Sequence, residues 1–244
     1  DRNVGGTAGA MAIEYDFDPE DDVQRLSVGT TYETRAVLQD NISRGEITGK
    51  KDCVGGTVGR MDLGAAAGCQ SYGSVTSSSG SYGGGLAGWS ESVIRDSFAK
   101  CVLSGQDDVG GIAGYNEISG VLMDSETVCE ITGAHYTGGI VGDNVGNIVG
   151  CLNKSDINVS NEDKSKSLED INLEQYTTGI LNSLDRDEDE KADKLSTTDN
   201  TVDTGGIAGL STGIIQNCVN EGTVGYEHVG YNTGGIVGRE SGYV

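Results

Sequence analysis

Basic residues are scarce in this chain, which carries 16 Lys and Arg against 38 Asp and Glu and has a formal net charge of −22. Nucleic-acid binding depends on a surplus of Lys and Arg that neutralises phosphates, so the shortage argues against a nucleic-acid partner. It argues equally against an anionic membrane surface. No run of about 18 apolar residues is present to span a bilayer, and no signal segment opens the chain. The chain begins at Asp1 without Met, which is typical of a processed or excised piece.

Large apolar side chains are also few. Aromatic residues make up 5% and apolar residues 35% of the 244 residues, so the core must be built from small and β-branched side chains. A helical bundle packed with Phe and Leu is therefore not expected. The six cysteines are too few for a disulfide-stapled scaffold, and none forms a CxxC motif or stands at zinc-ligand spacing from His135 or His228.

Glycine, by contrast, is abundant, with 40 residues, and much of it lies in a repeat. The strings VGGTAG, VGGTVG, GGGLAG, VGGIAG, TGGIVG, TGGIAG and TGGIVG are seven copies of one motif. Their anchor glycines are Gly5, Gly55, Gly84, Gly110, Gly138, Gly205 and Gly234. Four of the six intervals are 26 to 29 residues long, and the other two, of 50 and 67 residues, fit the same unit with insertions of about 22 and 39 residues.

Each unit contains three short β-prone stretches, in which Ile, Val, Ala or Cys alternates with polar residues, and glycine turns separate them. Three strands and three turns in about 28 residues make one coil of a β-solenoid, which buries its inner face only by stacking on neighbouring coils. The sequence predicts an all-β fold, a right-handed parallel β-helix of about six to seven coils forming one domain over residues 1–244. Four isoleucines with a shared offset from the anchor should form one inward ladder, namely Ile112, Ile140, Ile207 and Ile236.

We expect the two glycines of each pair to have different roles: one adopts a positive φ at the corner, and the other allows close backbone packing. Five cysteines follow their anchors by 13 to 19 residues, and we expect them to share one inward position. They are Cys69, Cys101, Cys129, Cys151 and Cys218. A column of buried, unpaired thiols is the expected arrangement, and a metal or redox ladder is the alternative. Cys53 stands outside this column.

The repeat pattern, GGIxG followed by Gly-x-Ile and then Cys-x-Asn-x-Gly-x-Val-x-Gly, resembles the GLUG-motif repeats of bacterial surface proteins. That family includes large secreted, adhesin-like proteins, chiefly of Gram-positive bacteria, and regions of IgA-specific zinc metallopeptidases. The resemblance covers most of residues 1–10, 36–157 and 203–244. It implies a secreted or cell-surface location. The HExxH zinc signature of the peptidases is absent from this chain.

Two acidic insertions, residues 11–35 and 156–203, depart from the family pattern and together carry −14 of the net charge. The second is expected to be part helical, since Ser167 and Asp170 approximate a capping box ahead of apolar residues that fall on one helical face. Packing against the solenoid is the expected role of this helix, and contact with a partner is the alternative.

Both insertions contain alternating carboxylates of the kind that calcium loops use. The candidate ligands are Asp185, Asp187, Asp189, Asp16 and Asp18, with Asp21 and Asp22 beside the last two. An EF-hand loop would need Gly and Glu where Glu190 and Ser196 stand, so we expect solvated acidic loops and no tight calcium site. No other cofactor is indicated.

Catalysis is not expected of this chain. No pair of carboxylates is singled out across successive coils, and neither histidine has a nucleophilic partner in a recognisable motif. Trp89 and four tyrosines that occur about once per coil, Tyr72, Tyr82, Tyr115 and Tyr136, fit packing roles as well as sugar platforms. We therefore expect a non-catalytic, surface-exposed adhesin or stalk segment whose partner is a host or bacterial surface protein or a glycan. The alternatives are a carbohydrate-binding or carbohydrate-cleaving β-helix and the non-catalytic arm of an IgA-peptidase-like protein.

Overall fold

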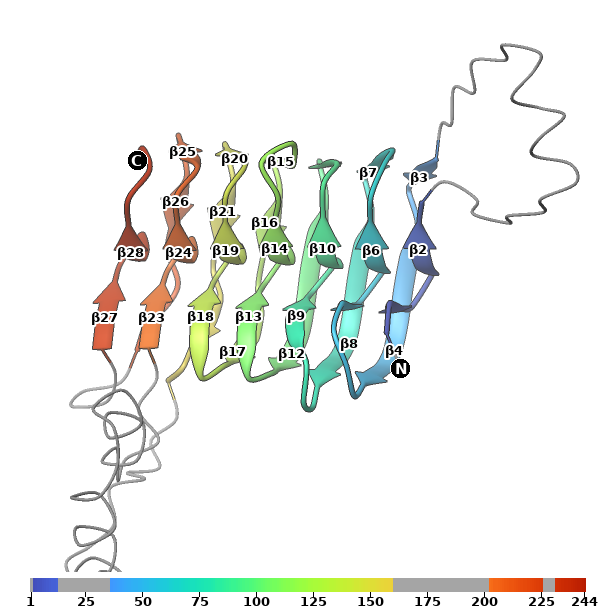
Figure 1. The fold of residues 1–244 in the computed structure, drawn as a ribbon, viewed down its shortest axis with the longest axis horizontal. Helices are drawn as coiled ribbons and strands as arrows, with labels where there is room; N and C mark the ends of the chain where they lie inside the picture. Colours follow the sequence, from blue (N-terminus) through green and yellow to red (C-terminus); the bar gives the residue numbers. More distant parts are fainter. Residues whose placement is uncertain (1, 13–35, 160–201, 226–230) are drawn as a thin grey trace, which may run out of the picture.

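The glycine-pair repeats stack as coils of short parallel β-strands, and the described residues contain no helix (Figure 1). The structure, a computed structural model, describes residues 2–12, 36–159, 202–225 and 231–244. These residues form a β-solenoid of about six turns, which confirms the predicted fold class. Within them, no helix is both long and apolar enough to cross a membrane.

The two halves of each glycine motif lie in two separate seven-stranded sheets. The first sheet contains, in order, β1 (Val4–Gly5), β5 (Val54–Gly55), β9 (Ser81–Gly84), β13 (Asp107–Gly110), β18 (His135–Gly138), β23 (Val202–Gly205) and β27 (Tyr231–Gly234). The second contains β2 (Ala8–Met11), β6 (Val58–Met61), β10 (Ala87–Ser90), β14 (Ala113–Asn116), β19 (Val141–Asn144), β24 (Ala208–Ser211) and β28 (Val237–Glu240).

Two further sheets complete the coil. The third contains β3 (Val37–Gln39), β7 (Ala65–Ala67), β11 (Val93–Arg95), β15 (Val121–Met123), β20 (Asn147–Val149) and β25 (Ile214–Gln216). The fourth contains β4 (Ile42–Gly49), β8 (Gln70–Ser77), β12 (Phe98–Ser104), β16 (Glu126–Thr127), β17 (Glu130–Thr132), β21 (Leu152–Asn153), β22 (Asp156–Ile157) and β26 (Val219–Asn220). The sequence predicted three strands per coil, but each complete coil contributes to four sheets, because the chain reverses at the glycine pair and divides that stretch in two. Two coils have five strands, since each supplies two short strands to the fourth sheet.

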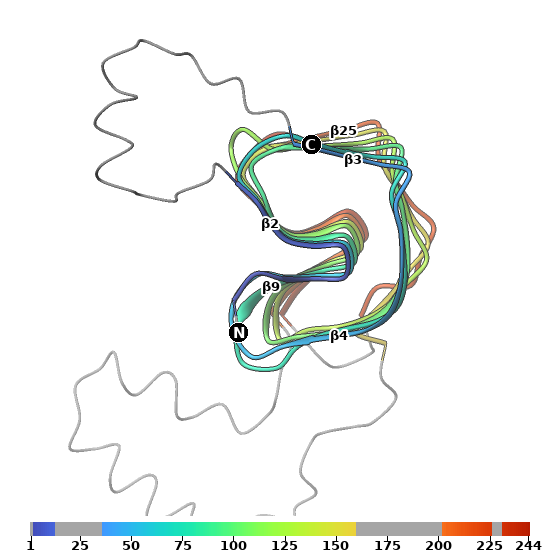
Figure 2. The ribbon, with the colours of Figure 1, turned by 90° about the vertical axis from the view of Figure 1, so that its right-hand side faces the viewer.

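The cross-section of the solenoid is indented (Figure 2). The first and second sheets fold inward together, and the third and fourth sheets wrap around them. Seen from the N-terminal end, the chain runs clockwise as it recedes, so the winding is right-handed, as predicted. The glycine pairs lie at the tip of the indentation, where they meet the fourth sheet from inside.

The predicted isoleucine ladder is present. Ile112, Ile140 and Ile207 are fully buried, and Ile236 in the last coil packs against the core while staying partly exposed. Successive members are joined by parallel backbone hydrogen bonds, for example from the amide of Ile112 to the carbonyl of Ile140 at 2.8 Å. Identical residues of successive coils stack in register, so each one is buried against the same residue type. This arrangement explains how a chain poor in large side chains builds a core.

The motif glycines serve close packing, and the predicted positive φ at a glycine of the pair is wrong. None of them has a positive φ. A Cβ on Gly111, the second of its pair, would overlap the carbonyl oxygen of Gly139 in the next coil, and one on Gly114 would lie 2.6 Å from Cα of Tyr82. The first contact lies between coils and the second between the facing sheets, so space alone requires glycine at both positions.

Polar side chains are stacked inside the solenoid as well. The fully buried Asn116 donates from Nδ2 to Oδ1 of Asn144 at 2.8 Å, and Asn144 donates to Oγ of Ser211 at 3.3 Å. A second ladder runs from Oγ1 of Thr127 to Asn153 at 2.8 Å and from Asn153 to Asn220 at 2.7 Å. Asn116, Asn144 and Asn153 each donate to a polar side chain of the next coil, and Oδ1 of Asn116 is buried without a hydrogen-bond partner among the described residues.

The cysteines are free thiols, as predicted, but they occupy two columns where one was expected. Strand register places Cys69, Cys151 and Cys218 in the first column, with Ser97 and Ser125 between them. Cys101 and Cys129 lie together in the second. Membership of different columns explains the main difference in offset, 13 or 14 residues against 17 or 19, and turns of different length between the second and third sheets account for the rest. Cys218 is only half-buried, whereas the other four are buried.

Strands reach into both predicted insertions. Met11 belongs to β2, β22 covers Asp156–Ile157, and β23 begins at Val202. The first insertion thus leaves the coil between the second and third sheets, and the second leaves it between the fourth and first sheets. The predicted helix and the candidate calcium ligands, Asp16, Asp18, Asp185, Asp187 and Asp189, lie outside the described residues.

Candidate functional site

Side chains of mixed chemistry line the mouth of the indentation, where the first and second sheets face each other. We call this line of two facing rows the seam. The row on the first sheet consists of Asn3, Cys53, Tyr82, Asp108, Tyr136, Asp203 and Asn232. The row on the second sheet consists of Ala10, Arg60, Trp89, Tyr115, Asp143, Leu210 and Arg239.

Every residue of the first row has left-handed backbone geometry. The φ angles of the seven lie between 50° and 70°, and each residue stands two positions before its anchor glycine. Only glycine, Asn and Asp adopt this region at low cost, yet two tyrosines and one cysteine also occupy it. The surrounding stack therefore imposes this conformation on residues that do not prefer it.

Three aromatic rings meet in the seam. The Trp89 indole stacks on the Tyr115 ring with centroids 4.3 Å apart and planes 18° from parallel, and Tyr82 contacts both rings edge-on at 5.0 and 5.4 Å. The Arg60 guanidinium lies 5.0 Å from the Trp89 ring. Because β6 and β14 flank β10 on opposite sides, Arg60 and Tyr115 cover opposite faces of the indole. Trp89 therefore has no free ring face on which a sugar could stack.

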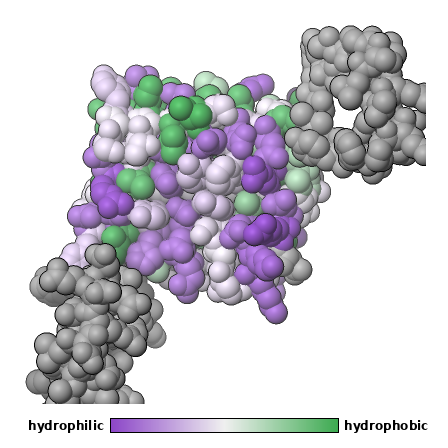
Figure 3. Space-filling view, in the orientation of Figure 1, coloured by the Kyte–Doolittle hydropathy of each residue, from purple (hydrophilic) through white to green (hydrophobic). Residues whose placement is uncertain are grey.

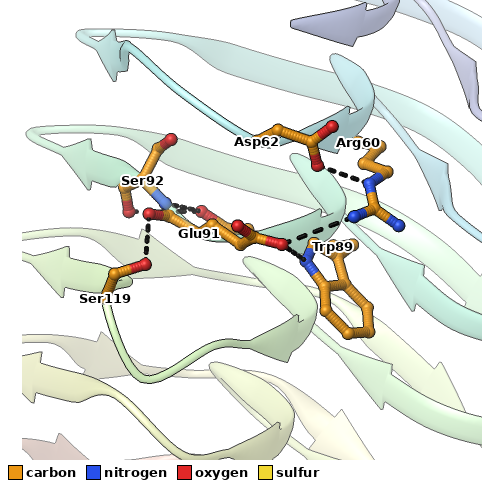
Figure 4. A network of polar contacts seen from close by, with 7 residues as sticks. Arg60, Asp62, Trp89, Glu91, Ser92 and Ser119 are labelled. Atoms are coloured by element: carbon orange, nitrogen blue, oxygen red, sulfur yellow. Dashed lines mark hydrogen bonds and ion pairs between the residues drawn. The ribbon is translucent and has the colours of Figure 1, made fainter. Parts of the chain in front are cut away.

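Carboxylates hold the Arg60 end of this stack in place (Figure 4). Arg60 donates from Nε to Asp62 and lies 3.4 Å from Oε1 of Glu91. The same Glu91 oxygen accepts a hydrogen bond from Nε1 of Trp89 at 3.1 Å. Ser119 from the following coil donates to the backbone carbonyl of Glu91 at 2.8 Å. One carboxylate thus fixes both partners of the cation–π contact, and three successive coils are joined.

Two carboxyl groups that form no ion pair with a described Lys, Arg or His lie farther along the seam. Burial, together with the charges of Asp143 and Asp107, raises the pKa of Asp108 to about 7. Burial likewise raises the pKa of Asp143 to about 6, although the Arg239 charge offsets part of the effect. Oδ1 of Asp143 is buried without a hydrogen-bond partner among the described residues. A pair of carboxyl groups that titrate near neutral pH can exchange a proton with a bound molecule.

At the C-terminal end of the seam, an arginine neutralises the charge of a buried carboxylate. Arg239 lies 3.1 Å from Oδ2 of the fully buried Asp203, and its guanidinium is 5.6 Å from the ring of Tyr136. Oδ1 of Asp203 accepts a hydrogen bond from Asn232 at 2.7 Å. Arginines at both ends of the seam therefore pair with an aromatic ring and a carboxylate, and among the described residues no arginine forms such a pairing with Asp108 or Asp143.

The fourth sheet carries a separate, shallow feature outside the seam. A shallow depression of about 380 Å³ is lined by Arg44, Gly45, Tyr72 and Gly73 on the fourth sheet. Arg44 lies 5.1 Å from the Tyr72 ring, which also contacts Phe98 at 5.9 Å. The face seen in Figure 3 is mostly hydrophilic or intermediate, with its hydrophobic residues in small groups. The seam is therefore the strongest candidate site in the described part of the chain.

The structure brings together three of the five aromatic residues that the sequence singled out, Tyr82, Trp89 and Tyr115. Tyr136 lies in the same row two coils from Tyr82, and Tyr72 lies on the fourth sheet. The sequence reasoning missed the charged residues of the seam. A signal existed, because the first row lies two residues before each anchor and the second row five residues after it.

Within the described ranges, no three His, Cys, Asp or Glu side chains are placed to hold a metal ion together. Comparisons of the chain with protein-family models, curated proteins and solved structures gave no match. The role of the seam is therefore inferred from its own contacts.

The aromatic stack should contribute measurably to stability. We expect Trp89→Ala to lower the free energy of unfolding by about 2 kcal/mol, because the ring contacts of a half-buried indole are lost and Arg60 no longer has its aromatic partner. Trp89→Phe keeps most of the stacking and should cost less than about 1 kcal/mol. Urea unfolding followed by circular dichroism measures both. Equal losses in the two variants would contradict a stacking role.

Proposed function

We propose that this chain is a non-catalytic, surface-exposed solenoid, an adhesin or stalk segment of a larger secreted bacterial protein with GLUG-type repeats. The observation that carries the proposal is the unbroken stack, in which each strand of the first and second sheets pairs in register with the next coil. Such a stack lengthens by about 4.8 Å per coil and is suited to holding attached segments away from a surface.

The contacts of the seam support the same proposal. An enzyme needs groups that face the substrate, whereas Arg60, Trp89 and Arg239 have partners in neighbouring coils. Their interactions run along the stack and hold successive coils together. The two acidic insertions leave the solenoid at different corners and in different coils, so they are the segments that we assign to contact with a surface protein or glycan.

This function can be tested with three forms of the protein, namely the full chain and two variants in which residues 13–35 or 160–201 are replaced by a short Gly-Ser linker. Each is applied to immobilised extracellular-matrix proteins and to a glycan array. Binding by the full chain that falls at least tenfold in one variant, with an unchanged β-sheet spectrum, is the expected result. Binding that survives both replacements would contradict the assignment of the contacts to the insertions.

A carbohydrate-active role is the second candidate, favoured by the raised pKa values of Asp108 and Asp143. Glycoside hydrolysis uses one protonated and one ionised carboxyl group, and both forms coexist near neutral pH in such a pair. Release of reducing ends from a polysaccharide panel, abolished by Asp108→Asn and by Asp143→Asn, would favour this role. Asp203→Asn is the matched control, since Arg239 already neutralises Asp203.

The third candidate is the non-catalytic arm of an IgA-peptidase-like protein. It rests on the same repeat resemblance and differs from the first only in what the rest of the open reading frame encodes. An HExxH motif outside this segment would favour the peptidase arm, and a cell-wall sorting signal would favour the adhesin or stalk.

A further inference from the structure

Two pairs of cysteines lie side by side in neighbouring coils. Pairing of Leu152 with Val219 places Cys151 beside Cys218, and the Val219 amide donates to the carbonyl of Cys151 at 2.9 Å. Pairing of Val102 with Glu130 places Cys101 beside Cys129 in the same way. In-register neighbours on parallel strands are about 4.8 Å apart at Cα, which falls within the range that a disulfide spans.

The two pairs differ in access to solvent. Cys101 and Cys129 are each 4% exposed and Cys151 is 1% exposed, whereas Cys218 is only half-buried. Its partner Cys151 therefore lies directly behind a thiol that solvent reaches. A reagent in solution can attack the outer sulfur, and the inner one is then in position to respond.

The protonation states of Cys151 and Cys218 suit thiol–disulfide exchange. The interaction between the two neighbouring thiols lowers the pKa of Cys218 to about 7 and raises the pKa of Cys151 well above its ordinary value. Cys218 is therefore the more acidic of the two thiols, and its S–H, when present, donates to the carbonyl of Gln216 at 3.3 Å. The thiolate is the nucleophile in thiol–disulfide exchange, and a thiol with a pKa near ambient pH reacts best.

We propose that Cys218 and Cys151 form a redox-modification site at which a small-molecule disulfide is reduced and a protein disulfide is formed. The Cys218 thiolate attacks one sulfur of the reagent, forms a mixed disulfide and releases the first reagent thiolate. Cys151 loses its proton to solvent, attacks Sγ of Cys218 and releases the second reagent thiolate. Two protein thiols are oxidised and one reagent disulfide is reduced to two thiols, so atoms and electrons balance.

The consequence would be a covalent clamp between the coils on either side of the second insertion. The bond closes a loop from residue 151 to residue 218 and so ties the C-terminal coils to the rest of the stack. In the chain-entropy account, such a long loop gives a large stabilisation of the oxidised form. The site thereby couples the redox state of the surroundings to the strength of one particular junction in the solenoid.

The test uses the full chain and 4,4′-dithiodipyridine, whose released thiopyridone is followed by absorbance under native conditions. We expect a rapid phase that releases two thiopyridones per chain, followed by slow labelling of the buried thiols. Cys218→Ser should abolish the rapid phase. Cys151→Ser should release one thiopyridone rapidly and retain the reagent on Cys218. Cys129→Ser, the matched control in the buried pair, should leave the rapid phase unchanged.

Serine is compatible with these positions, because Ser97 and Ser125 already occupy the column of Cys151 and Cys218 and Ser155 follows Cys129 in the other. A non-reducing peptide map of the oxidised wild type should contain a cross-linked fragment joining Cys151 to Cys218. The oxidised protein should melt on the order of 10 °C higher than the reduced form. A mixed disulfide that persists on Cys218 in the wild type, or a rapid phase that survives Cys218→Ser, would overturn the proposal.

Discussion

Adding one methyl group at Gly111 should lower the free energy of unfolding by about 4 kcal/mol or more. In the Gly111→Ala variant the new Cβ would overlap the carbonyl oxygen of Gly139 and lie 2.8 Å from Cγ2 of Thr127. The Gly139 oxygen belongs to the backbone of the next coil, so relief requires two hydrogen-bonded coils to separate. Urea unfolding of the purified variant measures the loss, and a cooperative transition at a much lower midpoint is expected.

The chain offers a matched control for this change. Gly235 holds the equivalent place in the last coil, where a Cβ would meet nothing within 4 Å. Gly235→Ala should therefore change stability by less than about 0.5 kcal/mol. Similar losses in both variants would mean that glycine is required for its backbone conformation and not for close packing between coils.

Acidification should stabilise the protein through Asp108. Its pKa in the fold is about 7, compared with about 3.8 ordinarily, so the folded state binds this proton more tightly than the unfolded state does. The associated stability is complete below pH 4 and is lost as the pH rises through about 7. At 1.36 kcal/mol per unit of pKa difference, the loss is on the order of 3 to 4 kcal/mol. Asp143 adds a smaller change in the same direction, since its pKa rises only to about 6 and the Arg239 charge offsets part of the effect of burial.

Asp108→Asn isolates this contribution from the general repulsion among the acidic residues. Asn already stands at the same left-handed position in two other coils, at Asn3 and Asn232, so the backbone accepts it. We expect the variant and the wild type to be equally stable at pH 4 and the variant to be about 3 kcal/mol more stable at pH 8. Asp203→Asn should show no such gain, because Asp203 is ion-paired with Arg239. Parallel pH dependence in wild type and Asp108→Asn would refute the prediction.

The periodic features of the fold were predictable from the sequence because they repeat as residue types. Isoleucine at a constant offset from a glycine pair identifies an inward ladder whichever coil contains it. The left-handed row was not predictable in the same way, since Asn, Cys, Tyr and Asp share a backbone conformation there and no side-chain chemistry. The reversal that divides each glycine stretch into two strands escaped prediction for a related reason, because it depends on the facing sheet.

Constant offsets from the anchor mark the two rows of the seam, but the contacts within the seam could not be derived from single-unit patterns. Its chemistry arises where side chains from different coils meet, as when Arg60, Trp89 and Tyr115 stack across three coils. The cysteine columns show the same limit. Counting residues from the anchor gave Cys69 and Cys101 one shared position, and only strand register reveals that they belong to different columns.

The direction of the backbone hydrogen bonds determines how the solenoid responds to mechanical tension. These bonds run along the stack from coil to coil, and the two ends of the described chain lie at opposite ends of the stack (Figure 1). A pulling force applied at those ends therefore peels the outermost coil from its neighbour one bond at a time, while the interior coils stay loaded but intact. Each released coil of about 28 residues lengthens the chain by roughly 90 to 100 Å. A stack of this kind extends in steps under load and dissipates work at each one.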